Sequence, residues 1–379
     1  MSSGKKLLRP SDDPVGAAQI VRLTEELDKI TQYQRNNDLV TNSLELQETA
    51  LSSINDVVNR ARVLVVQSGN GILSSADKKA IGAEIEQIRN QVLDLMNTQN
   101  ASGEYIFAGY QAQSQAFEFN PSAQSNHVTF VGDDGTNEIQ LSDSVSVQST
   151  SSGKTVFADV FARLNFSEQP SSTATLTASK IEHQGSFDKF HKQNFDSANP
   201  VNNQFRFEIT SPSNVRVSNV GTGQVLDNIP YENGQAIVYQ GMSLSIDGTP
   251  GQAVDLSLNR PEKKNLAESL HDMFLALNDE SLSQNDFLNR IDDTLVNLDN
   301  GLEKIAIENS SLGARMNIAQ SVKSSNLDNE IANTKAKASI QDVDYAKASA
   351  EFSKQETALE AAFQSFPRVV NLSLFNYIS

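Results

Sequence analysis

A chain of 379 residues with a net charge of −17 is poorly suited to bind nucleic acid or an anionic membrane, since both need clustered Lys and Arg. Cysteine is absent, which excludes disulfides and thiolate metal sites, and no window approaches the roughly 18 unbroken apolar residues of a membrane span. The length allows two or three domains, and the mean hydropathy of −0.39 fits thin helical rods with little deep core.

The first predicted helix begins at Pro14. Asp13 is placed to act as its N-cap, and Pro14 occupies the first helical position, where the missing N–H costs nothing. The carboxylates of Asp12 and Asp13 also face the positive end of the helix dipole. An acidic pair could instead hold a cation, but Pro14 favours the capping interpretation. We expect this helix to run to about Gln67.

Two long segments, one toward each end of the chain, carry a heptad repeat of apolar residues. In the first they are Ile30, Tyr33, Val40, Leu44, Leu51, Ile54, Val58, Ala61 and Val65, interrupted by polar Asn37 and Gln47. In the second they are Leu288, Ile291, Leu295, Leu298, Leu302, Ile305, Leu312, Met316 and Ala319, interrupted by Asn309. A 3.5-residue repeat makes a narrow seam that another helix must cover, so we expect the two segments to pack together.

A second helix is predicted over 76–99, capped by Ser75 or Ser74 after a break at Gly69-Asn70-Gly71. Residues 121–260 then alternate with period two, as in strands. The dipeptides that separate these strands are of the hairpin type: Asp134-Gly135, Asn233-Gly234 and Asp247-Gly248. Within this region we expect 148–200 to form long loops or weak edge strands. Helices are expected again near 262–277, with apolar Leu266, Leu270, Phe274 and Leu277, and over 285–335.

The last predicted helix carries a different apolar stripe. Its residues are Tyr345, Phe352, Leu359 and Phe366, seven apart, with Phe363 beside them, and the chain closes on Leu374 and Phe375. Aromatic residues exposed in this way imply burial against another chain or another segment.

These patterns predict an α+β fold. A long antiparallel coiled-coil rod is built from both chain ends, with a mostly antiparallel β domain inserted in the middle. The expected boundaries are 1–115 and 261–339 for the two rod segments, 116–260 for the β-rich outer domain and 340–379 for the terminal helix.

Several motifs resemble those of bacterial flagellar axial proteins. The pieces Ser3-Gly4-Lys5-Lys6, Arg9-Pro10-Ser11-Asp12-Asp13-Pro14 and Gly313-Ala314-Arg315-Met316-Asn317 are similar to flagellin. The piece Asp342-Val343-Asp344-Tyr345-Ala346 also matches. Two others favour the hook–filament junction family, hook-associated protein 3, within the flagellin-like superfamily: Gly103-Glu104-Tyr105-Ile106-Phe107-Ala108-Gly109-Tyr110 and Ser373-Leu374-Phe375.

The resemblance implies a structural subunit that polymerises as an adapter ring between the hook and the flagellin filament. Its partners would be further copies of itself, a neighbouring hook-associated protein and flagellin, with Arg315 and Asn317 as the first candidates for the subunit interface. A local helix contact within one subunit is the alternative role of these two residues. It would be exported by the flagellar type III apparatus to an extracellular position, without a Sec signal. The stripe of the terminal helix, with Leu374 and Phe375, would bind an export chaperone before secretion and neighbouring subunits afterwards.

One departure from the family lies at the start of the chain. Family members carry about one more N-terminal helix before the S-G-K motif, whereas this chain starts at Met1-Ser2-Ser3-Gly4. The family implies that such a helix pairs with residues 340–379 in an inner tube. Without that cover, we expect residues 340–379 to be mobile in the isolated monomer and to become ordered on a partner. Folding of this helix back onto the chain's own rod is the alternative.

Catalysis is not expected. The sequence has no H-E-x-x-H, G-x-S-x-G or P-loop motif, and its histidines, His127, His183, His191 and His271, lie in unrelated contexts. Residues 133–138 faintly resemble a calcium loop but lack its twelve-residue spacing, which favours a hairpin turn. We therefore expect no cofactor and no metal. The alternative functions are flagellin or another hook-associated axial protein, and after these a type III secreted translocator or adhesin.

Overall fold

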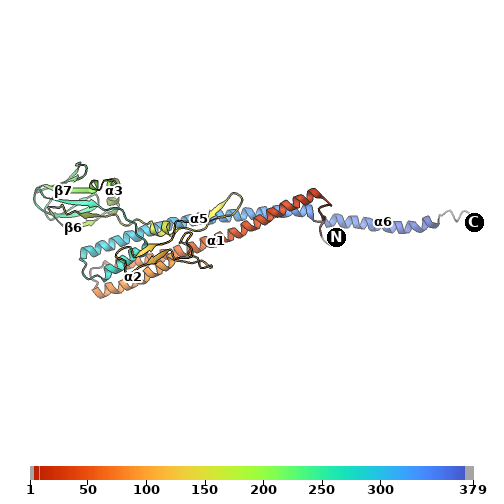
Figure 1. The fold of residues 1–379 in the computed structure, drawn as a ribbon, viewed down its shortest axis with the longest axis horizontal. Helices are drawn as coiled ribbons and strands as arrows, with labels where there is room; N and C mark the ends of the chain where they lie inside the picture. Colours follow the sequence, from red (N-terminus) through yellow and green to blue (C-terminus); the bar gives the residue numbers. More distant parts are fainter. Residues whose placement is uncertain (1–3, 8, 372–379) are drawn as a thin grey trace, which may run out of the picture. The chain divides into compact units, whose positions relative to one another are not determined.

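The computed structural model describes residues 4–7 and 9–371 (Figure 1). It forms two compact units, each assembled from separate stretches of chain. Unit 1 comprises the described residues of Met1–Asn42, Glu138–Val147 and Arg315–Ser379; unit 2 comprises Ser43–Asn137 and Gln148–Ala314. These units cut across the four predicted segments, because contacts in space rather than chain continuity define them. Within 4–7 and 9–371, no helix is both long enough and apolar enough to span a membrane.

Unit 1 is built on an antiparallel pair of helices. The pair consists of the first part of α1 (Pro14–Ser68) and the last part of α5 (Gln284–Gln341). Asn37 donates to the Ala319 carbonyl at 2.7 Å, and Gln34 bonds Glu330 at 2.6 Å. These contacts run in opposite directions along the two helices, as an antiparallel coiled coil requires. The sequence prediction that the two heptad segments cover each other is therefore confirmed.

A short hairpin lies against this helix pair. It is formed by β3 (Glu138–Gln140) and β4 (Ser146–Gln148), and its residues 138–147 belong to unit 1. Asn36 of α1 donates to the Gln140 carbonyl, and Asn326 of α5 donates to the Leu141 carbonyl. These strands alternate as predicted, but they pack on helices rather than on the large sheets.

The helical part of unit 2 contains the rest of α1 and α5 together with α2 (Ser75–Met96) and α4 (Leu266–Asn278). The apolar stripe of α1 is fully buried here, from Leu44 to Val65. On α5 the predicted stripe is buried at Ile291 and Leu298. The prediction is wrong at Leu288, whose side chain is 40 % exposed, because the neighbouring Phe287 occupies the buried position.

A second hairpin, of β1 (Phe117–Phe119) and β2 (Val128–Phe130), belongs to unit 2. The last helix, α6 (Tyr345–Asn371), belongs to unit 1. The hairpin β1–β2 is antiparallel, with Phe119 opposite Val128. Side chains from α4, from its N-cap and from the C-cap of α2 bond the hairpin backbone.

The apolar core of the β domain lies between two antiparallel sheets and one helix in unit 2. One sheet has the order β5-β12-β7-β8-β9 and the other β10-β11-β6. The elements are β5 (Phe166–Glu168), β6 (Thr175–Ile181), α3 (Gln184–Asn194), β7 (Gln204–Ser211), β8 (Asn214–Asn219), β9 (Val225–Pro230), β10 (Ala236–Tyr239), β11 (Met242–Asp247) and β12 (Ala253–Leu258). Inward residues of every second position fill the core, which also receives Phe187 and Phe190 of α3. The predicted α+β fold class, with its mostly antiparallel β region, is confirmed.

Two local predictions are wrong. Residues 148–200 were expected as loops and weak strands, but they include α3, whose aromatic residues are buried in the core. The three Asp-Gly and Asn-Gly dipeptides do not close hairpins, since each connects strands of different sheets. A two-residue hairpin is instead closed by Gln240-Gly241, both at positive φ, between β10 and β11. Gln is uncommon in this conformation, so the sequence carried little signal for that turn.

Candidate functional site

The flagellin-like motifs of the two chain ends meet in unit 1. Lys5 and Asp342 form an isolated antiparallel bridge, in which Lys6 N–H donates to Gln341 O at 2.7 Å and Val343 N–H donates to Gly4 O at 3.1 Å. Gly4 has φ +65°, which favours glycine at this position. The motifs are therefore joined by backbone hydrogen bonds at the point where α5 ends and α6 is about to begin.

Acidic residues cap the helices that start from these motifs. The carboxylate of Asp13 accepts the N–H groups of Val15 and Gly16, at 3.1 and 3.0 Å, just before α1 begins at Pro14. Asp344 does the same for α6, since it accepts the Ala346 N–H at 3.0 Å. Each carboxylate supplies acceptors for N–H groups that lack partners within the helix.

The two residues proposed for a subunit interface lie two positions apart on α5. Arg315 is half-buried and already takes part in an interaction within the chain, whereas Asn317 is exposed. Two positions correspond to about 200° around a helix, so these side chains leave the helix on nearly opposite sides. Asn317 is thus accessible to a partner, and Arg315 has a role inside the subunit.

The apolar stripe of α6 is exposed to solvent. Tyr345, Phe352, Leu359, Phe363 and Phe366 are each between 58 and 69 % exposed. Their spacing places them on one side of the helix, so together they form an apolar face that the described residues leave uncovered. Leu374 and Phe375, which were predicted to extend this face, lie outside the described residues.

The aromatic motif around Tyr105 forms a bend that is pinned by Asp133. Gly103 and Gly109 both have positive φ, +80° and +73°, and Ile106 and Phe107 between them are buried. The carboxylate of Asp133 accepts the Tyr110 N–H at 2.9 Å. This hydrogen bond and a second from a backbone N–H hold the pKa of Asp133 below its ordinary value.

These contacts also bear on the faint calcium motif at 133–138. Asp133 bonds backbone N–H groups, and Asp134 pairs with Lys154 at 2.6 Å. Both carboxylates therefore serve the fold, although the connection they occupy joins two different sheets and is not the hairpin turn that was predicted.

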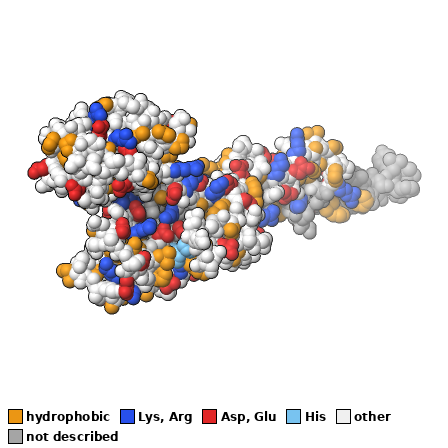
Figure 2. Space-filling model, turned by 60° about the vertical axis from the view of Figure 1, so that its left-hand side comes forward, with side chains coloured by type: hydrophobic (Ala, Val, Ile, Leu, Met, Phe, Trp, Pro, Cys, Tyr) orange, Lys and Arg blue, Asp and Glu red, His pale blue; other side chains and the backbone are white. Residues whose placement is uncertain are grey.

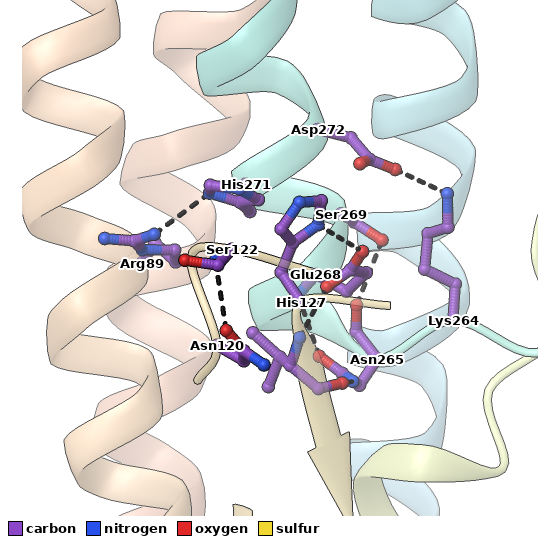
Figure 3. A network of polar contacts seen from close by, with 11 residues as sticks. Arg89, Asn120, Ser122, His127, Lys264, Asn265, Glu268, Ser269, His271 and Asp272 are labelled. Carbon is purple, nitrogen blue, oxygen red and sulfur yellow. Dashed lines mark hydrogen bonds and ion pairs between the residues drawn. The ribbon is translucent and has the colours of Figure 1, made fainter. Parts of the chain in front are cut away.

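A polar cluster is buried where the β1–β2 hairpin meets α2 and α4 (Figure 3). The rings of His127 and His271 lie 4.3 Å apart, and Arg89 Nη1 lies 2.9 Å from His271 Nδ1. The prediction that the histidines occupy unrelated contexts is wrong for this pair. No local signal could reveal it, because the two residues lie far apart in sequence and meet only after the hairpin has packed on the helices.

Carboxylates complete the cluster. Glu268 Oε1 lies 3.3 Å from His127 Nδ1, and Glu268 Oε2 accepts the Val128 N–H at 2.7 Å. Asp272 pairs with Lys264. His127, Glu268 and Asp272 bring ligand atoms within 4.8 Å of one another, but each carboxylate already has a donor from the protein. Both carboxylates are thus engaged by the protein's own donors, and we assign no metal.

Burial shapes the electrostatics of this cluster. Arg89 and His271 are 4 and 5 % exposed. Burial, with the charges of His127 and Arg89, lowers the pKa of His271, while Glu268 and Asp272 oppose the shift. Burial also lowers the pKa of Arg89, against the raising effect of Glu86.

On the molecular surface, acidic and basic side chains are interspersed over the face shown in Figure 2.

Comparisons with known families match both ends of the chain. The bacterial flagellin N-terminal helical region matches residues 1–112, and the bacterial flagellin C-terminal helical region matches residues 295–378. Together the two regions take in just over half of the chain and leave the β domain unmatched.

Individual relatives agree with this result. The flagellar hook-associated protein 3 of Escherichia coli is 36 % identical over 117 residues, which is 31 % of this chain and 37 % of that protein. The chain thus spans little more than a third of this curated relative. The flagellar junction protein FlgL of Legionella pneumophila is 25 % identical, with a TM-score of 0.60, over 85 % of this chain and all of that one. FlgL of Xanthomonas campestris, at 22 % identity and TM-score 0.62 over 83 and 99 % of the two chains, shares the fold.

Proposed function

Because this chain belongs to the flagellin-like family of bacterial flagellar proteins, we propose that it is a structural subunit of the junction between hook and filament. The observation that carries the proposal is the antiparallel pairing of α1 with α5, whose ends bear the family motifs. The similarity of the whole fold to a flagellar junction protein supports it. A role as an enzyme has no support, since the matched relatives are named as hook-associated, junction or flagellin proteins.

In this role the subunit assembles with other flagellar components. It forms a ring with copies of itself and contacts a neighbouring hook-associated protein on one side and flagellin on the other. It reaches this extracellular position through the flagellar export apparatus. The exposed face of α6 supports the proposal, because an apolar face of this kind is expected to be buried in an assembly.

Cellular location tests this function. In a strain that lacks its own junction protein, expression of this chain should restore filament attachment, and an antibody should label hook tips when flagellin is absent. Labelling along the whole filament, with no requirement at the hook tip, would favour the flagellin alternative. Failure to appear on flagella of either kind would contradict the proposal.

The subunit interface is tested at Asn317 and Arg315. Asn317→Ala should impair ring assembly while leaving the helical circular dichroism of the monomer unchanged, because this side chain is exposed. Arg315→Ala should affect both, since Arg315 is half-buried and has a partner within the chain. Unimpaired assembly of Asn317→Ala would remove that residue from the interface.

The face of α6 also suggests a partner before export. We infer that a cytoplasmic chaperone covers Tyr345, Phe352, Leu359, Phe363 and Phe366, and that neighbouring subunits replace it after secretion. Burial of each such side chain contributes roughly 1.5–3 kcal/mol of favourable free energy. Because several of these side chains are exposed on one face, binding of a partner that covers them is favoured.

Hydrogen exchange tests this inference. In the isolated chain, amides from Tyr345 to Phe366 should exchange fast, and the chaperone should slow them. The double variant Phe352→Ala with Leu359→Ala should weaken the complex and leave the melting temperature nearly unchanged, since both side chains are exposed in the monomer. Strong protection of this segment without any partner would instead mean that α6 packs on its own chain.

A further inference from the structure

The β1–β2 hairpin is fastened to helices by side chains that bond its backbone. At the C-cap of α2, Asn97 accepts the Phe117 N–H at 2.9 Å and donates to the Phe117 carbonyl at 2.8 Å. On the other strand, Glu268 accepts the Val128 N–H at 2.7 Å, and Asn265 donates to the Val128 carbonyl at 2.8 Å. Each strand is thus held at one residue, by a donor and an acceptor together.

A third contact holds the hairpin at Phe119. The guanidinium of Arg89 lies 4.0 Å from the centroid of the Phe119 ring, and the His271 ring meets the same ring edge-on at 5.2 Å. Arg89 is oriented by His271, since its Nη1 lies 2.9 Å from His271 Nδ1. Arginine can only donate, so Nδ1 must be the unprotonated acceptor. This contact therefore requires a neutral His271.

Charged groups face His271 from every element around it. Arg89 comes from α2, where it also pairs with Glu86 at 3.6 Å. His127 comes from the hairpin. Glu268 and Asp272 come from α4, and Asp272 is paired with Lys264. Among these groups, the cation Arg89 makes the polar contact with the His271 ring. A proton on His271 would thus remove an acceptor and place two cations side by side in a buried site.

We propose that Arg89 and His271 form a proton-sensitive latch that holds the β1–β2 hairpin on α2 and α4. With His271 neutral the latch is closed. Protonation breaks the Arg89–His271 hydrogen bond, frees the guanidinium from Phe119 and opens the hairpin. The two hydrogen bonds between Asn97 and the Phe117 backbone involve no titratable group, so this end of the hairpin stays held. Opening therefore begins at the end where Phe119 pairs with Val128.

The direction of the pH effect follows from linkage. The folded state lowers the pKa of His271 below its ordinary value of 6.5, so the folded state binds fewer protons than the open state. The stabilisation is therefore fully present above pH 6.5 and is lost as the pH falls from there through the folded-state pKa. Each unit of the shift corresponds to about a tenfold change in the opening equilibrium.

Hydrogen exchange of the full chain, in buffer with EDTA to remove adventitious cations, tests the latch. Exchange rates are corrected for the intrinsic pH dependence of amides. Between about pH 7.5 and pH 5, the range in which histidine charge changes, opening of residues 117–130 should increase, while the buried stretch of α1 stays protected. Unchanged protection of the hairpin at the lower pH would overturn the proposal.

Two histidine variants distinguish the latch from a nonspecific loss of stability at low pH. Gln at position 271 can still accept from Arg89 and does not titrate, so His271→Gln should keep the hairpin protected and abolish its pH dependence. His183 is exposed, and His183→Gln should leave the pH dependence intact. If His271→Gln fails to fold, an NMR titration of the wild-type chain with labelled histidines measures the pKa of His271 directly and tests the latch. A pKa of His271 at or above 6.5, or a persistent pH dependence in His271→Gln, would contradict the latch.

Discussion

At the scale of single residues, the buried carboxylate of Asp255 shows how charge is accommodated inside the β domain. Asp255 in β12 is 2 % exposed and faces Arg206 across the ladder in β7. Two hydrogen bonds join them, at 2.8 and 2.7 Å, and Ser171 donates a third at 2.6 Å. The bonds from Arg206 lower the pKa of Asp255 against the effect of burial. The ion pair and Ser171 therefore keep a charge stable at a buried position.

Removal of the arginine should expose the cost of that burial. Arg206→Ala is expected to reduce the free energy of unfolding by about 2 kcal/mol, less than the roughly 3–5 kcal/mol of a fully buried pair because Arg206 is half-exposed. Arg216 on the same sheet pairs with Glu208, and both are partly exposed, so Arg216→Ala should cost under about 1 kcal/mol. Urea unfolding followed by circular dichroism measures both. Equal costs would show that the burial of Asp255 has no energetic weight.

At the scale of elements, polar residues in the heptads of α1 bond backbone carbonyls. Asn37 and Gln47 are fully buried, and their amides donate to Ala319 O and Ser149 O, each at 2.7 Å. An apolar side chain at position 37 would pack but would not specify which residue of α5 lies opposite, whereas Gln47 bonds the connection that follows β4. A buried polar residue such as Asn37 fixes the register of a coiled coil.

Helix α2 is started by a capping box. The Ser74 hydroxyl accepts the Asp77 N–H, and the Asp77 carboxylate accepts the Ser74 N–H. Ser74→Ala should lower the stability of the chain by about 1 kcal/mol, because a helical N–H loses its acceptor. Ser75 makes one exposed bond to Glu280, so Ser75→Ala is the matched control and should change stability by less than about 0.5 kcal/mol. Thermal melts of the two variants would refute the cap if Ser75→Ala were the more damaging.

At the scale of the whole molecule, the chain enters and leaves the β domain through adjacent strands. Phe166 of β5 pairs with Leu258 of β12, and the Asn259 N–H donates to Asn165 O at 3.0 Å. A bridge between Phe161 and Lys263 continues the pairing toward the helices. The domain is thus an insertion whose two ends lie side by side, which allows the helices on either side to fold without it.

Excision of this insertion provides a test. A chain in which residues 166–258 are replaced by a short Gly-Ser linker should keep its helical circular dichroism, because the linker joins residues that already lie close together. The separate segment 164–260 should fold alone, since the apolar core of the two sheets lies within it. If the shortened chain loses its helices, the sheets and helices form one cooperative unit.

The sequence predicted the elements whose signal is local and repeated. Heptad spacing located α1 and α5, and Pro14 located the start of α1. The prediction was wrong where a short polar segment gains its structure from packing: α3 is helical because Phe187 and Phe190 enter the core of the sheets. Turn dipeptides misled for a related reason, since Asn-Gly favours a tight turn but does not determine which sheet receives the next strand.

The sequence by itself determined the fold class and the family resemblance, because apolar periodicity and short motifs are properties of neighbouring residues. The tertiary structure decided which distant groups meet. His127 and Glu268 are 141 positions apart, yet they share a buried site with His271 and Arg89. Their environment arises only when a hairpin and two helices exclude water together, and that burial, with the charges of His127 and Arg89, lowers the pKa of His271. No local pattern records such an environment.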